Sequence, residues 1–308
     1  RLQVVRRLAP EGTREILHAS MSAVALTFPW LFDADWPVIA LAVLGVGTML
    51  AIRMVPTVRD ALGGVLHVSD QPSVGDLCFP VAVCGLYLFV GDSPVLYTIP
   101  LLLLGVAGPL AALVGVRMGQ TAYSTVEGPK SREGTAAFAV LAFLCVHVPL
   151  VLFTPVGRVE GLWIAAIAAA LATTVEAVSW RGLDNLFLPL GTVAILMRLL
   201  TFPAPLLAGH AVVMLLLILL ASSMRRETTV GGAGVFEAVL VGYLAWALGG
   251  TAWLLPSVLV CLLYSRVWPA AVRLVQELQT PVWRQRLRAS RDALDGGGPL
   301  DRAGRCIM

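Results

Sequence analysis

Long apolar runs, separated by short polar connections, recur along most of the chain. Stretches such as 161–177 and 204–222 contain at most one charged residue, and a helix needs roughly 17–25 mainly apolar residues to cross a bilayer. The pattern predicts ten spans, at approximately 17–32, 36–55, 76–91, 94–116, 134–154, 161–179, 185–201, 204–223, 232–249 and 251–266. The sequence therefore predicts an all-α, polytopic integral membrane protein with about ten transmembrane helices.

Composition supports this class and excludes others. Hydrophobic residues make up 58% of the chain and charged residues 13%, whereas soluble domains carry about 25% charged residues. The net charge of +3 is too small and too dispersed to indicate a nucleic-acid partner. We expect the protein to work in a lipid bilayer without binding nucleic acid.

The distribution of basic residues predicts the orientation. Twenty of the 22 lysines and arginines fall at the two ends of the chain and in alternate connections, and only Arg158 and Arg198 lie elsewhere. Connections rich in basic residues stay in the cytoplasm. We therefore expect both termini to be cytoplasmic, in a multi-pass protein of a prokaryotic cytoplasmic (plasma) membrane.

Polar residues that are costly inside a bilayer gather on the predicted cytoplasmic side. They form four clusters along the sequence, which contain Arg14 and His18; Asp76; Lys130, Ser131, Arg132 and Glu133; and Glu176, Arg181, Asp184 and Asn185. A transporter that works by alternating access is expected to carry polar residues in both halves of the bilayer. The one-sided arrangement favours a site at the cytoplasmic interface.

Glu176 lies within an apolar helix, about one turn from its predicted cytoplasmic end. A carboxylate in this position needs a partner, water or a bound proton. The short hairpin that follows returns Asp184 and Arg181 to its side, so that two carboxylates could hold a divalent cation through oxygen ligands. The alternative is an ion pair between Glu176 and Arg181, with Asp184 only capping the next helix.

Lys130 is the only lysine of the chain and lies in the polar segment Gly128–Gly134, just before an apolar helix. Lys130 and Arg132 near a helix N-terminus form a plausible phosphate site, because exposed backbone N–H groups add to the positive charge. The alternative is that they are ordinary basic residues of a cytoplasmic loop. A lone lysine among arginines suggests a site that a guanidinium group does not fit.

The four clusters together resemble the motifs of the phytol kinases and their dolichol-kinase relatives. The resembling segments are Arg14-Glu15-Ile16-Leu17-His18, followed by Phe28-Pro29-Trp30; Ser69 to Pro80 with Gly75-Asp76 and Phe79-Pro80; Lys130-Ser131-Arg132-Glu133-Gly134-Thr135; and Glu176-Ala177-x-Ser179 with Gly182-x-Asp184-Asn185. Each motif is weak alone, but their order over residues 14–190 is specific. The segment 229–250 also resembles the first membrane part of the phytyl-phosphate kinases.

The resemblance implies an integral-membrane enzyme that phosphorylates an isoprenoid alcohol such as phytol, geranylgeraniol or a polyprenol, with CTP as donor and Mg²⁺ as cofactor. It implies phosphate binding by Arg14, Lys130, Ser131, Arg132, Arg181 and Asn185. It implies metal binding by Glu176, Asp184 and Asp76, and deprotonation of the alcohol by His18, Glu133 or Asp184. Catalysis would consist of positioning and charge neutralisation.

One departure from the family pattern leaves other functions open. Gly108 stands where the family usually has an aspartate ahead of an Ala-x-x-x-Gly segment. One alternative is a phosphatidate cytidylyltransferase-like enzyme of the related CDP-diacylglycerol synthases, although the ending typical of those enzymes is absent. Another is a non-catalytic membrane scaffold or transporter that lost its chemistry with this aspartate.

Three parts are expected along the chain. Residues 1–201 form the part that resembles lipid-alcohol kinases, residues 202–268 add further transmembrane helices, and residues 269–308 form a basic cytoplasmic tail. The tail mixes arginines with apolar residues. It is either a solvated flank of the last span or an amphipathic helix on anionic lipid headgroups.

Overall fold

The computed structural model describes residues 15–55, 74–126, 128–224 and 232–279, so that Arg14 and most of the predicted tail lie outside the described residues. Residues 15–26 are helical. The elements that follow are α2 (Phe28–Leu31), α3 (Asp35–Met54), α5 (Gly75–Val90), α6 (Pro94–Leu102), η1 (Leu103–Ala107), α7 (Gly108–Met118), β1 (Ala122–Thr125), β2 (Gly128–Ser131), α8 (Arg132–Phe153), α9 (Arg158–Val178), α10 (Asp184–Leu199), α11 (Ala204–Met224) and α12 (Gly232–Gln279).

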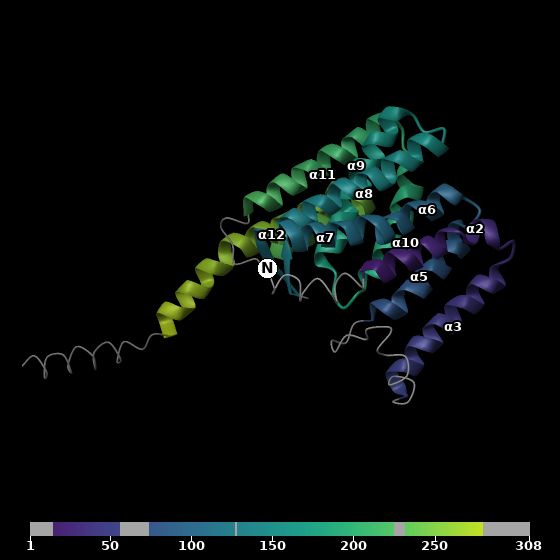
Figure 1. Ribbon diagram of the computed structural model, residues 1–308. Helices are drawn as coiled ribbons and strands as arrows, with labels where there is room; N and C mark the ends of the chain where they lie inside the picture. Colours follow the sequence, from purple (N-terminus) through teal and green to yellow (C-terminus); the bar gives the residue numbers. More distant parts are fainter. Residues whose placement is uncertain (1–14, 56–73, 127, 225–231, 280–308) are drawn as a thin grey trace, which may run out of the picture.

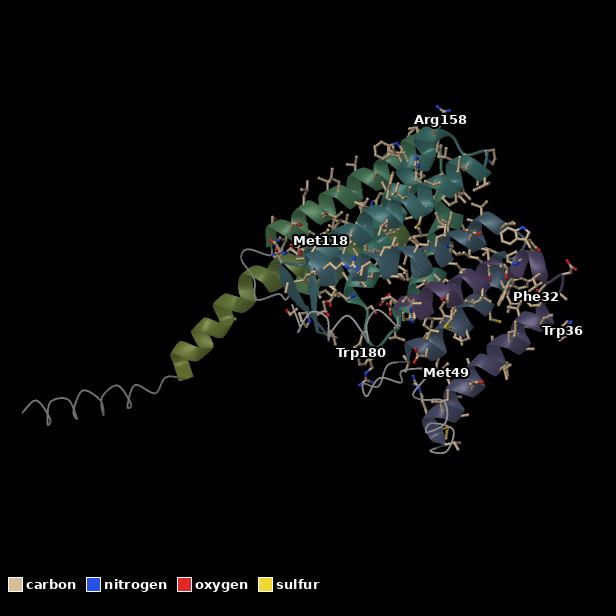
Figure 2. The ribbon with its side chains drawn as sticks, in the orientation of Figure 1. Phe32, Trp36, Met49, Met118, Arg158 and Trp180 are labelled. Atoms are coloured by element: carbon tan, nitrogen blue, oxygen red, sulfur yellow. The ribbon has the colours of Figure 1, made fainter. Side chains whose placement is uncertain are left out.

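The helices form an up-and-down bundle, with α3 at one edge and α11 at the other (Figure 1). Phe32, Trp36 and Arg158 lie toward one end of the bundle, whereas Met118 and Trp180 lie toward the other (Figure 2). Consecutive connections thus alternate between the two ends, as the spacing of the apolar runs predicts.

Six helical segments in the described part are long and apolar enough to cross a membrane. One of them joins α6, the π-helical turn η1 and α7 into a span of 25 residues, Pro94–Met118. The apolar helix α5 is shorter, with 16 residues. The protein is therefore a multi-pass membrane protein, and the count of ten crossings stays a prediction.

Helix α12 contains a sharp reversal at Gly250, where φ is 62° and ψ is −152°. This backbone conformation is essentially restricted to glycine. Ser257, beyond the reversal, lines the same small cavity as Ala238, before it. The two arms of α12 therefore lie side by side, and they correspond to the predicted spans 232–249 and 251–266.

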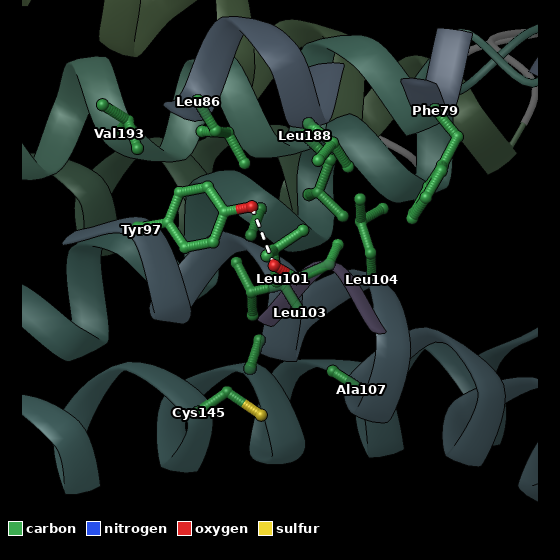
Figure 3. Close-up of a cluster of buried hydrophobic side chains, with 14 of the residues drawn as sticks. Phe79, Leu86, Tyr97, Leu101, Leu103, Leu104, Ala107, Cys145, Leu188 and Val193 are labelled. Carbon is green, nitrogen blue, oxygen red and sulfur yellow. Dashed lines mark hydrogen bonds between the residues drawn. The ribbon is translucent and has the colours of Figure 1, made fainter. Parts of the chain in front are cut away.

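One buried cluster joins the N-terminal helical segment to α5, α6, α8 and α10 (Figure 3). At its centre, the fully buried Tyr97 donates a hydrogen bond of 2.9 Å to the backbone oxygen of Ala25. A buried hydroxyl without a partner would be costly in an apolar environment. This bond therefore fixes the first helical segment against α6.

A second buried cluster joins the C-terminal helices to the rest of the bundle. Leu207, Met214 and Leu217 of α11 and Tyr243 of α12 pack with Ile164 of α9. The helices beyond residue 201 therefore share a core with the part that carries the four motifs.

The segment that contains Lys130 forms part of a short β-hairpin, and the other elements in the described part of the chain are helical. Strands β1 and β2 pair in antiparallel fashion, with Tyr123 opposite Lys130. Gly128, at the start of β2, has a φ of 133°, which favours glycine because it has no Cβ. The β-hairpin presents Lys130 to the end of the helical bundle.

The cytoplasmic location of both termini stays a prediction, and cysteine labelling tests it. In an otherwise cysteine-free variant in intact cells, we expect a membrane-impermeant maleimide to modify a cysteine at Asp92, because the basic residues lie on the opposite side. A cysteine at Lys130 should react only after the cells are opened. Labelling at 130 but not at 92 in intact cells would reverse the topology.

Candidate active site

A cavity of about 550 Å³ lies where three of the four predicted clusters meet. The N-terminal helical segment, α7, the β-hairpin, α8, α9 and α10 all contribute to its walls. Its polar and charged lining residues are Glu15, His18, Lys130, Ser131, Thr135, Glu176, Asp184 and Asn185. Six residues that the sequence singled out, from three of the four clusters, thus surround one space.

Lys130 and Glu176 form an ion pair in this cavity, with 2.7 Å between Nζ and Oε1. The Lys130 ammonium also donates a hydrogen bond to the backbone oxygen of Glu176. Both side chains are about one-quarter exposed, at 25% and 24%. One compact ammonium nitrogen therefore bonds to a carboxylate and a carbonyl of the same residue, whereas a guanidinium spreads its donors over a planar group. The expected alternative partner of Glu176, Arg181, does not take this place.

Asp184 is the first residue of α10, so that its charge suits the positive end of the helix dipole. The capping role considered from the sequence is wrong, because the N-cap position is Leu183 and has no side-chain hydrogen bond. Asp184 Oδ1 is buried and has no hydrogen-bond partner among the described residues. A buried oxygen of this kind can accept a ligand or a water molecule, because leaving it unpaired costs about 1–3 kcal/mol.

Asn185 connects the cavity to the start of α5, over a long sequence separation. Its Nδ2 donates a hydrogen bond of 3.2 Å to the backbone oxygen of Gly75, and Val74 N donates one of 2.8 Å to Arg181 O. A Cβ added at Gly75 would lie 2.9 Å from Asn185 Nδ2 and 3.2 Å from Gly182 Cα. The absence of a side chain at Gly75 thus allows this close approach. The Asn185 side-chain amide, which was predicted to bind phosphate, is bonded to the Gly75 backbone.

Two of the predicted phosphate ligands do not line the cavity. The Arg181 guanidinium lies over the Trp180 ring, 4.6 Å from its centre, and both residues are exposed. Arg181 has a φ of 56°, in the left-handed region that turns the chain between α9 and α10. Arg132 is exposed at the start of α8. Neither is among the lining residues of the cavity.

Asp76 and Glu133 are also absent from the cavity lining. The Asp76 carboxylate lies 3.8 Å from the Arg53 guanidinium. The Glu133 carboxylate accepts hydrogen bonds of 3.2 and 3.3 Å from Thr121 N, so that it holds the turn before the hairpin. Both carboxylates thus have partners away from the cavity, and their predicted metal-binding and catalytic roles stay predictions.

The predicted metal ligands are not brought together as a set of three. In the ranges that the structure covers, no group of three or more His, Cys, Asp or Glu side chains could hold a metal ion. Mg²⁺, however, is commonly bound by one or two carboxylates together with substrate phosphates and water. The unpaired buried oxygen of Asp184 fits this requirement, whereas Oε1 of Glu176 is already bound to Lys130.

Close packing of α7 against α8 positions the hairpin. The Ser131 hydroxyl caps α8 by accepting a hydrogen bond of 3.1 Å from Gly134 N. A Cβ added at Gly134 would lie 3.1 Å from Gly115 Cα, and one at Gly119 would lie 2.7 Å from Ser131 Cβ. Gly115 and Gly119 thus allow the end of α7 to lie close against Ser131 and the first turn of α8.

Gly108 lines the cavity directly. It is the first residue of α7 and follows the π-helical turn Leu103–Ala107, and π-turns within α-helices are frequent at functional sites. A Cβ added at Gly108 would meet only Leu103 O, at 3.6 Å. The position therefore has room for the family aspartate, and the glycine leaves that space open.

Sequence reasoning missed two contributors to the site. Glu15 lines the cavity with His18, and their separation of three residues in a helix could have indicated a shared face. The Tyr123 hydroxyl and Thr135 Oγ1 share a hydrogen bond of 2.7 Å. Burial raises the pKa of the Tyr123 phenol. The phenol therefore stays neutral and supports the hairpin. No sequence pattern pointed to this contact.

Comparison with known proteins gives one relative. A phytol kinase from Synechocystis sp. is 30% identical over 188 residues, which cover 60% of this chain and 78% of that protein. No family model and no solved structure matches. The relative agrees with the resemblance drawn from the motifs, several of whose residues surround the cavity. The chain belongs to the phytol kinase family.

Proposed function

We propose that the protein is a membrane-embedded kinase that transfers the γ-phosphate of CTP to the hydroxyl group of an isoprenoid alcohol such as phytol or geranylgeraniol. Membership of the phytol kinase family supports the reaction class. The observation that carries the proposal is Asp184 Oδ1, a buried carboxylate oxygen without a described hydrogen-bond partner, at a polar cavity beside apolar helices. Such a site suits a substrate with one hydroxyl group and a hydrocarbon chain.

Phosphoryl transfer requires little covalent chemistry from the protein, and mainly needs positioning and charge neutralisation. Lys130 supplies positive charge at the cavity wall, and its bond to Glu176 keeps the ammonium in one position. Asp184 would hold Mg²⁺, which supplies positive charge to the phosphates when bound. The hairpin and the α7–α8 contact keep these groups in a fixed geometry.

The alcohol must lose its proton during the transfer. Glu133 is a poor acceptor, since its carboxylate binds Thr121 N and lies outside the cavity lining. His18 and Asp184 both line the cavity and can accept a proton from a hydroxyl group within hydrogen-bond reach. We assign proton acceptance to His18, because the unpaired Oδ1 of Asp184 would be taken up by Mg²⁺.

Purified protein in detergent tests the proposal. The protein is incubated with CTP or ATP that is labelled in the γ-phosphate. The acceptors tested are phytol, geranylgeraniol, a polyprenol and diacylglycerol, and the labelled lipid phosphates are then separated. We expect labelled isoprenyl monophosphate, dependent on Mg²⁺. Formation of a CDP-lipid from phosphatidic acid and CTP labelled in the α-phosphate would instead indicate a cytidylyltransferase. No labelled lipid under any condition would favour the scaffold or transporter alternative.

Gly108→Asp is expected to raise activity. The new carboxylate enters open space at the cavity wall and adds a second oxygen ligand for a cation. We expect kcat/KM to rise about tenfold, which corresponds to about 1.4 kcal/mol, and the Mg²⁺ concentration at half-maximal rate to fall. Gly108→Asn is the control of equal size without the charge. Equal rates for the two variants and the wild type would show that position 108 takes no part in the reaction.

A further inference from the structure

A second cavity, of about 400 Å³, adjoins the active-site cavity. It lies between α9, α10 and the first arm of α12, and Asp184 and Leu188 line both cavities. Its other lining residues are mostly apolar, and they include Leu171 and Val175 of α9, Ile195 of α10, and Leu240 and Leu244 of α12. An apolar space thus meets the polar one at a single carboxylate.

Two polar atoms of residues that line this second cavity lack a hydrogen bond within the described part of the chain. Ser179 Oγ and Asp184 Oδ1 are both buried and have no hydrogen-bond partner among the described residues. The hydroxyl of Thr192, farther along the cavity, already donates a bond of 2.6 Å to Leu188 O. The cavity therefore has an apolar wall and one end with two unpaired polar atoms, as suits an amphiphile with a single small polar group.

We propose that this cavity binds the hydrocarbon chain of the isoprenoid alcohol and places its hydroxyl group at Ser179 and Asp184. The inference rests on the proposed kinase function and assigns the substrate-binding site. The volume lies within the roughly 300–1,000 Å³ typical of ligand pockets. From Asp184 to Ile195, α10 extends about 16 Å at its usual rise per residue, long enough to cover several isoprene units.

The placement gives a balanced transfer step. The alcohol oxygen attacks the γ-phosphorus, and a new oxygen–phosphorus bond forms as the bond to the β–γ bridging oxygen breaks. CDP leaves with that bonding electron pair, and the hydroxyl proton passes to His18, which lines the active-site cavity together with Asp184. Ser179 can donate a hydrogen bond to the alcohol oxygen and fix its position before the attack.

Another apolar cavity, of about 340 Å³, lies between the N-terminal helical segment, α3 and α5. It shares no lining residue with the active-site cavity. Its lining hydroxyl, Ser20 Oγ, donates a bond of 2.7 Å to Ile16 O. It therefore has neither the unpaired polar end nor the connection to Asp184, and we assign the substrate chain to the cavity beside α10.

Gly191→Leu tests the assignment. Gly191 lines the cavity, is exposed at the surface of α10, and has no atom within 4 Å of an added Cβ. The leucine side chain should narrow the cavity and raise KM for geranylgeraniol about tenfold, whereas kcat/KM for a five-carbon prenyl alcohol should stay unchanged. The matched control is Gly209→Leu on α11, which is equally open but outside the cavity.

Photo-labelling provides a measurement that does not depend on turnover. The full-length protein in detergent is irradiated with a geranylgeraniol analogue that carries a diazirine at the far end of its chain. We expect labelled peptides from α9, α10 and the first arm of α12, with less label in Gly191→Leu and no change in Gly209→Leu.

The two readouts separate the inference from the proposed function. Suppose that the wild type phosphorylates the alcohol, but the label lies on α3 and α5 and KM is unaltered in Gly191→Leu. This result would overturn the assignment of the cavity and leave the proposed kinase activity standing. In the opposite case, the label appears on the expected helices and is reduced by Gly191→Leu, but the wild type does not phosphorylate the alcohol. This result would support the chain-binding cavity and overturn the proposed kinase activity.

Discussion

Replacing Asp184 by asparagine is expected to lower kcat about 1,000-fold, or about 4 kcal/mol in activation free energy, without loss of folded protein. The substitution keeps the side chain's size but removes the charge that would hold Mg²⁺. Because Oδ1 has no described hydrogen-bond partner, the folded state loses no observed bond. Only its favourable position at the start of α10 is weakened, so the stability should change little. Turnover of geranylgeraniol and thermal unfolding in detergent measure the two effects.

Asp76→Asn is the matched control for this change. Asp76 lies outside the cavity lining, and its carboxylate is half-exposed and 3.8 Å from Arg53. Exposed ion pairs contribute only about 0–1 kcal/mol, so both turnover and stability should stay close to those of the wild type. If Asp76→Asn abolished the Mg²⁺-dependent rate while Asp184→Asn retained it, the metal would belong at Asp76 and the assignment of Asp184 would be wrong.

Lys130→Met is expected to lower both activity and stability. The substitution removes the ammonium from the cavity and leaves the Glu176 carboxylate without its partner. The loss in free energy of unfolding should be about 2 kcal/mol, as for a hydrogen bond to a charged group. Turnover should fall at least about 100-fold, or about 2.7 kcal/mol, since the phosphates lose a fixed positive charge. Nucleotide binding and thermal unfolding measure the two losses.

The double variant Lys130→Met/Glu176→Gln separates the two roles of the pair. Removing both charges should recover most of the stability, because no unpaired carboxylate remains, but turnover should stay low. Lys130→Arg keeps the charge, although its planar group cannot reproduce both contacts to Glu176, so we expect turnover about tenfold below the wild type. Full activity of Lys130→Arg would show that only the positive charge matters at this position.

Much of this protein follows from its sequence. Apolar runs place the helices, since only segments of sufficient apolar length can lie across a bilayer. The polar clusters are separated by whole spans, so chain connectivity alone brings His18, Lys130 and Asp184 toward one end of the bundle. The same motifs give the family, which the phytol kinase relative confirms.

The tertiary structure decides which side chains share the cavity. Arg181 and Asp76 belong to the right motifs but lie outside the lining, whereas Glu15 lies within it. Glu176 pairs with Lys130, 46 residues away, although Arg181 is closer in the sequence. Asn185 contacts Gly75 across 110 residues.

The physical reason lies in the helices themselves. A helix in a soluble protein shows its inward face as an apolar stripe, but these helices are apolar on nearly every side, and lipid is as apolar as the core. Periodicity therefore gives their lengths but not their rotation. Rotation is fixed by close contacts, such as Gly134 against Gly115 and Gly75 against Gly182, and by buried hydrogen bonds such as Tyr97 to Ala25. These contacts between distant segments create the two adjoining cavities that the sequence alone does not reveal.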